Sequence, residues 1–393
     1  MKSYDWIVVG GGLTGAAVSY ELIKKGFSVL LLEQDKTLQG ATRYSYGGIA
    51  YWAGTIALTR QLCAEGIERH RILSAELDAD TQFRELDLLL TINADHDPEI
   101  VAAPYATCAI PPRLLSVEAA CEMEPLLNRD AIAGALTVRH GHVHPHAIAQ
   151  AYRQAFCRLG GVQQVAQVTQ LGNPVSGILT ATGETYYGGK ILICAGGFSR
   201  ALLKTAGIAM RLYFTHAEVI ETPPVEVQLR TLVMPAEATR LPLETQSTTL
   251  EVDRLWDEPG HEPVPPIIEA GAIQFLDGSL RIGQISRVLT DIHAQVDSTQ
   301  SEAEIRTQVG KRLPALTHLP GNCYHCLVAF TADQLPLIGD CPNIEGIYIF
   351  SGFSSPFALV PPLAERFAYW ATGREDEIIP QLSPLRFAKD SVL

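Results

Sequence analysis

Three glycines and one acid near the start of the chain have the clearest chemical meaning in the sequence. Gly10, Gly12 and Gly15 follow the GxGxxG spacing, and Glu33 lies about 20 residues beyond them. In a dinucleotide site the first glycine allows a tight turn, the second lets the backbone approach a pyrophosphate, and the third lets a helix pack against a strand. A carboxylate at the position of Glu33 accepts hydrogen bonds from ribose hydroxyls. The pattern predicts a site for FAD or NAD, because a glutamate disfavours the 2′-phosphate of NADP; a glycine turn without a ligand is the alternative.

The elements around these glycines are the ones that such a site needs. An apolar run at 6–9 predicts a strand, the pattern through 16–23 predicts a helix that ends at the Lys-Lys-Gly run 24–26, and 29–32 predicts a second buried strand. The N-terminus of that helix would offer free N–H groups and a partial positive charge to phosphates. The order of strand, glycine turn, helix, strand and acid makes the prediction more specific than the glycines alone.

Three further glycine-rich segments are candidates for contact with the same ligand. The segment 39–49 is rich in glycine and small hydroxyl residues, and we expect it to lie at the ring end of the dinucleotide; an ordinary surface loop is the alternative. The run 190–197 predicts a buried strand that ends in a glycine turn, where backbone can approach a ligand. The run 347–355 also predicts a strand that ends in a glycine turn, and residues 337–340 before it are expected to form a turn.

The histidine-rich stretch HGHVHPH at 140–146 raises the question of a metal site. Its histidines alternate with other residues, but no cysteine or acid lies among them. Structural and catalytic zinc sites usually combine histidine with such ligands. We therefore predict no metal, and interpret the stretch as a turn leading into a helix with Pro145 near its first position.

The composition limits the partners and the cellular location. The chain has 393 residues, 47% of them apolar, which suits two intertwined domains with large cores. A net charge of −13 disfavours nucleic acid and anionic membrane surfaces as partners. No apolar run reaches the length of a membrane span, and the first residues do not form a secretory signal. The 8 cysteines are scattered, so we expect them to be reduced and the protein to be cytoplasmic.

Four stretches together resemble the D-amino-acid-oxidase family of FAD-dependent oxidoreductases, the group that includes glycine oxidase and monomeric sarcosine oxidase. They are GGGLTGA with its later Glu, GATRYSYGGI, ILICAGGFS, and TADQLPLIGDCPNIEGIYIFSGFSS. The last stretch is similar to the Thr-x-Asp-x-x-Pro-x-Ile-Gly segment of the family. The resemblance covers nearly the whole chain.

The resemblance implies an α/β fold with two domains. A Rossmann-type domain that binds FAD would comprise 1–85, 140–210 and 325–393. An α+β substrate domain with a mainly antiparallel sheet would comprise 86–139 and 211–324.

The resemblance also implies the reaction and the residues that contact FAD. The substrate would be a small amine or amino acid; its C–N bond would be oxidised by hydride transfer to flavin N5, the imine would be hydrolysed, and oxygen or another acceptor would take the electrons. The residues expected to bind FAD are Gly10, Gly12, Leu13, Thr14, Gly15, Glu33, Gln34, Ala41, Thr42, Arg43, Ser45, Gly47, Gly48, Ile49, Val168, Ala195, Gly196, Gly352, Phe353 and Ser354.

Two positions depart from the family pattern at the substrate end. Many members have an Arg five residues before the Asp of the Thr-x-Asp segment, or a Lys in the last glycine loop, to bind the substrate carboxylate. This chain has Val328 and Leu359 at those positions. A buried carboxylate without a cation is costly, so either the substrate lacks a carboxylate or another cation binds it. The candidates are Arg43, Arg281 and His216; solvated surface charges are the alternative for the two arginines.

Cys326 and Arg281 align with residues that have roles in monomeric sarcosine oxidase. Cys326 lies seven residues before Asp333, the spacing of the cysteine that links covalently to flavin there, so a thioether to FAD is one hypothesis. A buried structural cysteine and a Cys323–Cys326 pair are the alternatives. Arg281 aligns with a lysine that promotes the reaction with oxygen, and an arginine would act there by its charge.

Three other functions compete with amine or amino-acid oxidation. A flavin hydroxylase would be reduced by NAD(P)H. A protein that keeps the fold and FAD without amine oxidase activity is a second alternative, because both usual carboxylate-binding residues are missing. Modification of tRNA is a third, and the acidic charge argues against it.

Overall fold

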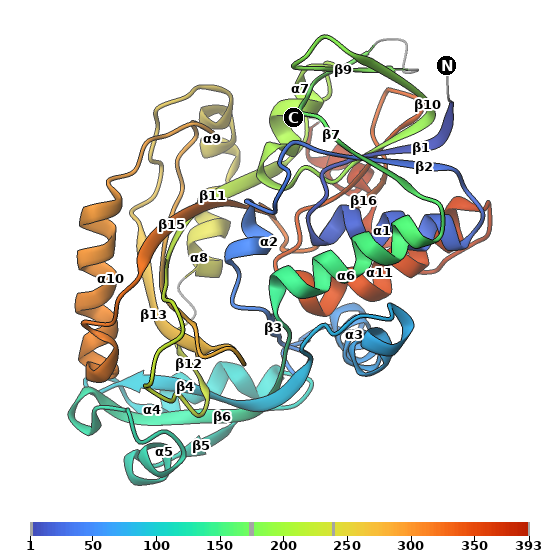
Figure 1. The fold of residues 1–393 in the computed structure, drawn as a ribbon. Coiled ribbons are helices and arrows are strands. Elements are labelled where there is room, and N and C mark those ends of the chain that lie inside the picture. The colour runs from blue at the N-terminus through green and yellow to red at the C-terminus, as the bar shows by residue number, and fades with distance from the viewer. Residues whose placement is uncertain (1–2, 173–176, 238–239, 392–393) are drawn as a thin grey trace.

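Two β-sheets carry the fold, and the chain crosses between them several times (Figure 1). The structure is a computed structural model that describes residues 3–172, 177–237 and 240–391. One sheet is largely parallel and the other largely antiparallel, which confirms the predicted α/β fold. No helix among the described residues is long and apolar enough to cross a membrane.

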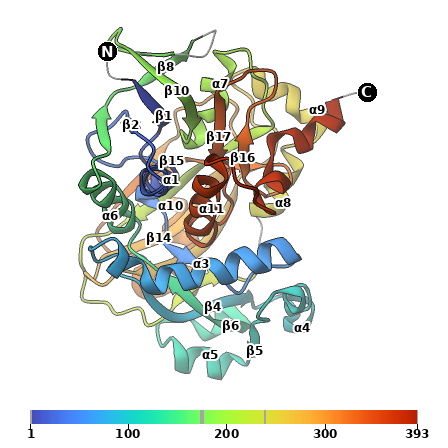
Figure 2. The same ribbon diagram turned by 90° about the vertical axis from the view of Figure 1, so that its right-hand side faces the viewer.

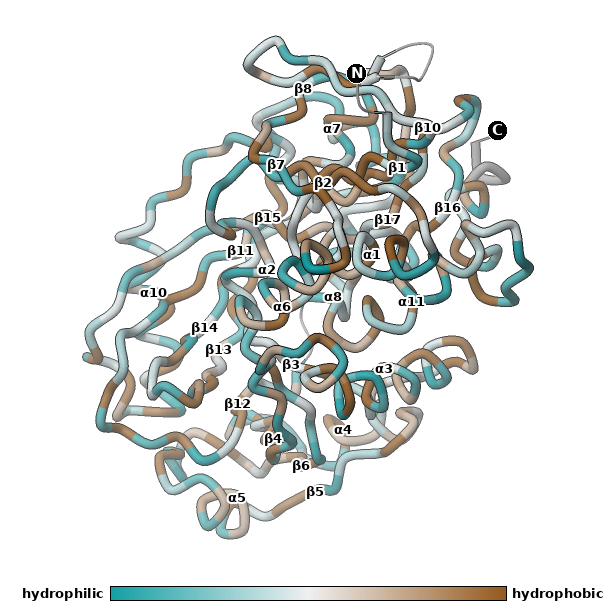
Figure 3. Tube along the Cα trace, turned by 45° about the vertical axis from the view of Figure 1, so that its right-hand side comes forward, coloured by the Kyte–Doolittle hydropathy of each residue, from teal (hydrophilic) through white to brown (hydrophobic). Residues whose placement is uncertain are grey.

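The first sheet is built on parallel strands that are buried on both faces. Its order is β16-β17-β10-β1-β2-β7, and Trp6 of β1 pairs with Val29 of β2 on one side and Lys190 of β10 on the other. Burial on both faces explains why β1 and β2 are continuous apolar runs, which Figure 3 shows in brown. Its strands are β1 Tyr4–Val9, β2 Val29–Glu33, β7 Val162–Val165, β8 Val168–Leu171, β9 Gly177–Thr180, β10 Thr185–Ile193, β16 Leu337–Asp340 and β17 Ile347–Ser351.

Helices α1, α6 and α11 lie side by side against this sheet, and α3 crosses beneath them (Figure 2). The short helix α2 lies between α6 and β15, where the two sheets approach each other (Figure 1). The α-helices are α1 Leu13–Lys24, α2 Ala41–Tyr44, α3 Ala57–Glu76, α4 Pro98–Ala102, α5 Val117–Met123, α6 Pro145–Arg158, α7 Ser199–Lys204, α8 Arg240–Gln246, α9 Leu250–Asp253, α10 Ser298–Arg312 and α11 Pro356–Ala371.

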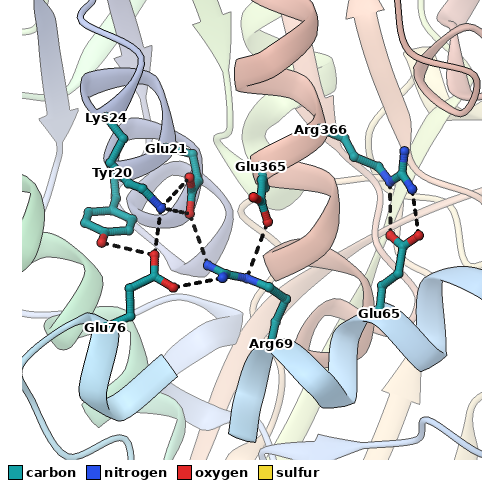
Figure 4. Close-up of polar contacts among 8 residues, drawn as sticks. All are labelled: Tyr20, Glu21, Lys24, Glu65, Arg69, Glu76, Glu365 and Arg366. Atoms are coloured by element: carbon teal, nitrogen blue, oxygen red, sulfur yellow. Dashed lines mark hydrogen bonds and ion pairs between the residues drawn. The ribbon is translucent and has the colours of Figure 1, made fainter. Parts of the chain in front are cut away.

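A network of ion pairs joins α1, α3 and α11 (Figure 4). Lys24 Nζ lies 2.7 Å from Glu76 Oε1, Arg69 Nη2 lies 3.3 Å from Glu21 Oε1, and Arg69 Nε lies 3.6 Å from Glu365 Oε2. Burial raises the pKa of Glu21. Burial alone would also raise the pKa of Glu76, but hydrogen bonds from Arg69 and Lys24 lower it to about 2. Glu76 therefore stabilises the packing of α3 on α1 as long as it is ionised.

The second sheet lies opposite and is antiparallel except for the parallel pair β12 and β4. Its order is β15-β11-β14-β13-β12-β4-β6-β3, with β5 on β6. β15 begins before the boundary predicted at residue 325, and all of it pairs with β11 in this sheet. Its strands are β3 Gly48–Ile49, β4 Arg84–Asn93, β5 Arg113–Leu115, β6 Ile132–His142, β11 Leu212–Glu221, β12 Leu232–Pro235, β13 Ile267–Gln274, β14 Leu280–Arg287 and β15 Asn322–Thr331.

Two local predictions are wrong. The turn expected at 140–145 is replaced by the end of β6, which pairs with β4 over its whole length and buries His140 and His142. The turn expected at 337–340 is strand β16, because its partner β17 holds it in an antiparallel ladder. In both cases pairing with another strand outweighs the local preference of the residues.

Candidate active site

The glycine turn between β1 and α1 has no room for side chains. Gly10 has φ +103°, and a Cβ there would lie 2.5 Å from Cys194 O. A Cβ at Gly15 would lie 1.8 Å from Gly10 O. The turn therefore packs against the end of β10 and against the first turn of α1. Such close packing is expected of a glycine turn that lets a pyrophosphate approach the backbone.

The groups beside this turn suit a dinucleotide. Gly12 precedes α1 without a side-chain cap, so, apart from Leu13 N, the N–H groups of the first helical turn stay open to an anion. Leu13 N donates to Thr42 Oγ1 at 3.0 Å, which attaches the segment after β2 to the helix start. Glu33 Oε2 accepts from Gly11 N at 2.6 Å, so the carboxylate stands at the turn. The cradle of glycines, the open helix end and the acid fit the adenosine and pyrophosphate of FAD.

A cavity of about 450 Å³ opens where the first turn of α1, the segment around α2 and the turn after β17 face the second sheet. It brings together several residues that the sequence predicts as cofactor contacts. These are Leu13, Thr14, Ala41, Thr42, Ser45, Gly48, Gly196, Gly352, Phe353 and Ser354.

The other predicted cofactor residues are not among the described residues that line the cavity. Val165 pairs with Glu33, and Ala166 N donates to Glu33 O at 2.8 Å, which places Val168 soon after the strand that flanks the acid. Gln34 is exposed beyond Glu33. Their contacts with FAD stay predictions, as do those of the residues that line the cavity. The predicted cofactor residues that do not line the cavity are Gly10, Gly12, Gly15, Glu33, Gln34, Arg43, Gly47, Ile49, Val168 and Ala195.

Arg43 and Arg281 share one acidic partner. Arg43 Nη1 and Nη2 lie 2.7 and 2.8 Å from the two carboxylate oxygens of Glu221, and Arg281 Nη1 lies 2.6 Å from Glu221 Oε2. Arg281 Nη2 also donates to Arg43 O at 3.0 Å, and burial lowers the pKa of Arg281. Both guanidinium groups are therefore engaged with Glu221, and neither residue is among the described residues that line the cavity. The role of Arg281 in the reaction with oxygen stays a prediction.

His216 is buried in the second sheet. Its Nδ1 lies 2.7 Å from His325 Nε2, and its Nε2 lies 3.0 Å from Asp291 O. Burial lowers the pKa of His216 to about 4, so the imidazole is neutral near pH 7. A neutral side chain with both nitrogens engaged is a weak partner for a substrate carboxylate, and it is not among the described residues that line the cavity.

Cys326 lines the cavity as a buried free thiol. Burial raises its pKa to about 12, and Arg240 and Arg281 oppose that rise. The thiolate is the form that attacks a flavin methyl group, so this environment disfavours the thioether. Cys323 is also a free thiol, and the two cysteines form no disulfide.

The histidines of 140–146 do not converge on a metal. Among the described residues, no three His, Cys, Asp or Glu side chains come together in a way that could hold an ion. Burial lowers the pKa of His140 and of His142 to about 3 each. His140 lines the cavity; its Nδ1 accepts from Trp52 Nε1 at 3.0 Å, which puts the proton on Nε2, beside Gly48.

Sequence reasoning missed two charged residues that line the cavity, Arg240 and Glu269. Arg240 is the first residue of α8; its Nε lies 3.2 Å from Oε1 of the fully buried Glu244, and its Nη2 donates to Ser354 O at 3.5 Å. Glu269 Oε2 accepts from Gln284 Nε2 at 3.3 Å. The i, i+4 spacing of Arg240 and Glu244 is a helical signal in the sequence, but nothing in it indicates a cavity.

Comparison with known proteins identifies the family. The protein-family model described as FAD dependent oxidoreductase (DAO) matches residues 5–370 of the chain. The chain is 24% identical over 380 residues to glycine oxidase of Geobacillus kaustophilus, with 92% of this chain and 90% of the relative covered. It is 25% identical over 390 residues to mitochondrial sarcosine dehydrogenase of Homo sapiens, with 93% of this chain and 39% of the relative covered.

Solved structures agree on the fold. Glycine oxidase from Geobacillus kaustophilus matches with a TM-score of 0.80 at 19% identity, covering 98% of this chain and 99% of the other. Iminodiacetate oxidase from Chelativorans sp. BNC1 matches with a TM-score of 0.77 at 17% identity, covering 96% and 98%. With a glycine cradle that fits FAD and a family model that spans most of its length, the chain belongs to the DAO family of FAD-dependent oxidoreductases.

Proposed function

We propose that this protein oxidises the C–N bond of an amino acid whose carboxylate binds Arg240. The observation that carries the proposal is the position of Arg240 in the cavity that also contains the predicted ring-facing residues Ser45 and Gly48 and the predicted cofactor residue Gly352. Two of the sequence-derived candidates, Arg43 and Arg281, are paired with Glu221 instead.

Arg240 has the properties of a carboxylate partner. Its side chain is 19% exposed, and the residue lines the cavity. Attraction by Glu244 raises its pKa, so the guanidinium stays charged at any physiological pH. A guanidinium in a cavity binds a carboxylate through charge-assisted hydrogen bonds and disfavours ligands that leave it unpaired.

The reaction divides between the cofactor and the chain. Bound FAD supplies the hydride acceptor at N5, and the oxidised C–N bond is an imine that water hydrolyses. The chain binds and orients the substrate: Arg240 holds the carboxylate, while apolar Leu232 and Met234 of β12 and Val328 of β15 line the cavity around the rest of the molecule. The names of similar proteins, among them glycine oxidase, sarcosine dehydrogenase and iminodiacetate oxidase, support a carboxylate-bearing amine as the substrate.

The test is anaerobic bleaching of the bound flavin by matched pairs of compounds. Each pair contains an amino acid and the amine that lacks its carboxylate, such as glycine with methylamine and sarcosine with dimethylamine. We expect at least one amino acid to reduce the flavin, and its matched amine to do so at least tenfold less efficiently. A ratio of about tenfold is what the loss of one charge-assisted hydrogen bond would cause. Equal reduction by both members of every active pair would contradict the assignment of Arg240.

A further inference from the structure

The cavity holds a carboxylate as well as a guanidinium. Glu269 of β13 lines it from the second sheet, while Arg240 lines it from α8. Among the described residues no ion pair joins Glu269 to Arg240; Glu269 instead accepts a hydrogen bond from the side-chain amide of Gln284, 3.3 Å away. An acid and a base that share a cavity without pairing present opposite charges to whatever enters.

The surroundings of Glu269 favour proton uptake. Burial raises the pKa of its carboxyl group, and Arg240 opposes that rise. Two other titratable groups feel the charge of Glu269, namely Glu244 of α8 and Tyr46 from the segment before β3: burial raises the pKa of both, and Glu269 adds to that rise. A carboxyl group with a raised pKa holds a proton more tightly than an exposed glutamate does, which makes it a better proton acceptor near neutral pH.

The other titratable groups that line the cavity are poorer acceptors. His140 has a pKa of about 3 through burial and is already neutral with its proton on Nε2. Burial raises the pKa of the Cys326 thiol to about 12, and it raises the pKa of the Tyr44 and Tyr46 phenols, so all three keep their protons.

We propose that Glu269 accepts the proton of the substrate ammonium group while Arg240 holds the substrate carboxylate. The inference rests on the proposed function, since it concerns the same amino-acid substrate. In the step, one N–H bond of the ammonium breaks and an O–H bond forms on Glu269, and the electron pair of the broken bond stays on nitrogen. The product is a neutral amine, whose lone pair supports loss of a hydride from the adjacent carbon. No further reactant is needed.

The test is the pH dependence of anaerobic flavin reduction by the amino acid found active, measured by stopped flow. Glu269→Gln should slow reduction by about 10²- to 10⁴-fold at pH 7. Because glutamine takes up no proton, its rate should then rise about tenfold per pH unit until the free amine predominates in solution. Glu269→Asp should restore the wild-type shape of the profile at a lower rate.

Glu244→Gln is the matched control. It removes a carboxylate that also pairs with Arg240, but Glu244 is not among the described residues that line the cavity. It should weaken substrate binding through Arg240 and leave the shape of the pH profile unchanged. The visible flavin spectrum of each variant shows whether the site is intact. Should Glu269→Gln lose its flavin, the wild-type and Glu269→Asp profiles decide: each rate must level off well below the pH at which the free amine predominates, and a rate that keeps rising about tenfold per pH unit up to that pH would contradict the proposal.

Two results would overturn the proposal in different ways. A Glu269→Gln rate that equals the wild-type rate, or is lower by one constant factor at every pH, shows a residue without a role in proton transfer and leaves the proposed function standing. A wild-type flavin that no amino acid reduces overturns the proposed function and this inference together.

Discussion

Replacement of Arg240 by methionine tests the substrate site and its support in one experiment. Methionine keeps an unbranched side chain but removes the guanidinium, so a substrate carboxylate loses its charge-assisted contact. Such a contact contributes about 1.5–3 kcal/mol, which corresponds to a dissociation constant about 10- to 140-fold higher. The substitution also removes the guanidinium that pairs with the fully buried carboxylate of Glu244.

The cost in stability follows from that burial. Breaking a buried ion pair by removing one partner costs about 3–5 kcal/mol when the remaining group stays charged. Burial already raises the pKa of Glu244, so part of this cost is avoided by proton uptake. We therefore expect Arg240→Met to unfold more easily, and the loss to be larger at alkaline than at neutral pH. The double variant Arg240→Met/Glu244→Gln should recover most of the stability without recovering substrate affinity.

Affinity is measured as the change in the flavin spectrum on titration with a non-reducing carboxylate, and stability as the free energy of unfolding in urea. Arg366→Met is the matched control: it removes an arginine of α11 whose Nη2 lies 2.6 Å from Oε1 of Glu65 on α3 (Figure 4), and Arg366 is not among the described residues that line the cavity. It should lower stability without changing carboxylate affinity. If Arg240→Met binds the carboxylate as tightly as the wild type does, the reasoning about the cavity is refuted.

Three further predictions concern the cofactor site and the helix network. Gly15→Ala should destabilise the protein by about 1–3 kcal/mol and lower its FAD content, because the new Cβ would lie 1.8 Å from Gly10 O; the ratio of flavin to protein absorbance measures this. Glu76 has a folded-state pKa of about 2 against its ordinary value of 4.5, so its stabilisation is complete above pH 4.5 and is lost as the pH falls to about 2; urea unfolding of Glu76→Gln should show a flatter pH dependence in that window. Acid precipitation should leave the yellow colour in the supernatant, because burial keeps the Cys326 thiol protonated; colour in the pellet that Cys326→Ser abolishes would show a thioether instead.

The parts of the fold that follow from local chemistry were predictable from the sequence. Gly10 and Gly15 lie at contacts where a Cβ has no room, so their spacing alone indicates the turn. The strands on either side are buried on both faces and therefore appear as continuous apolar runs. Strand β6 was missed, because pairing with β4 stabilises a strand that carries His140 and His142 in its buried end.

The substrate end depends on contacts between distant parts of the chain. Arg43 meets Glu221 across 178 positions, so no local pattern shows that its charge is already paired. Arg240 and Glu269 come together only because α8 and β13 both border the cavity, and neither lies in a recognisable motif. Sequence reasoning therefore identified the cofactor and the absence of the usual carboxylate-binding residues, but not the residue that we propose in their place.

The central claim is most directly tested by the products of one anaerobic turnover. A protein that oxidises the C–N bond of an amino acid should yield one carbonyl product, an oxo acid or an aldehyde, and one ammonia or amine for each flavin that is reduced, without NAD(P)H. Flavin reduction by NAD(P)H but by no amino acid, or reduction without a carbonyl product, would contradict the account.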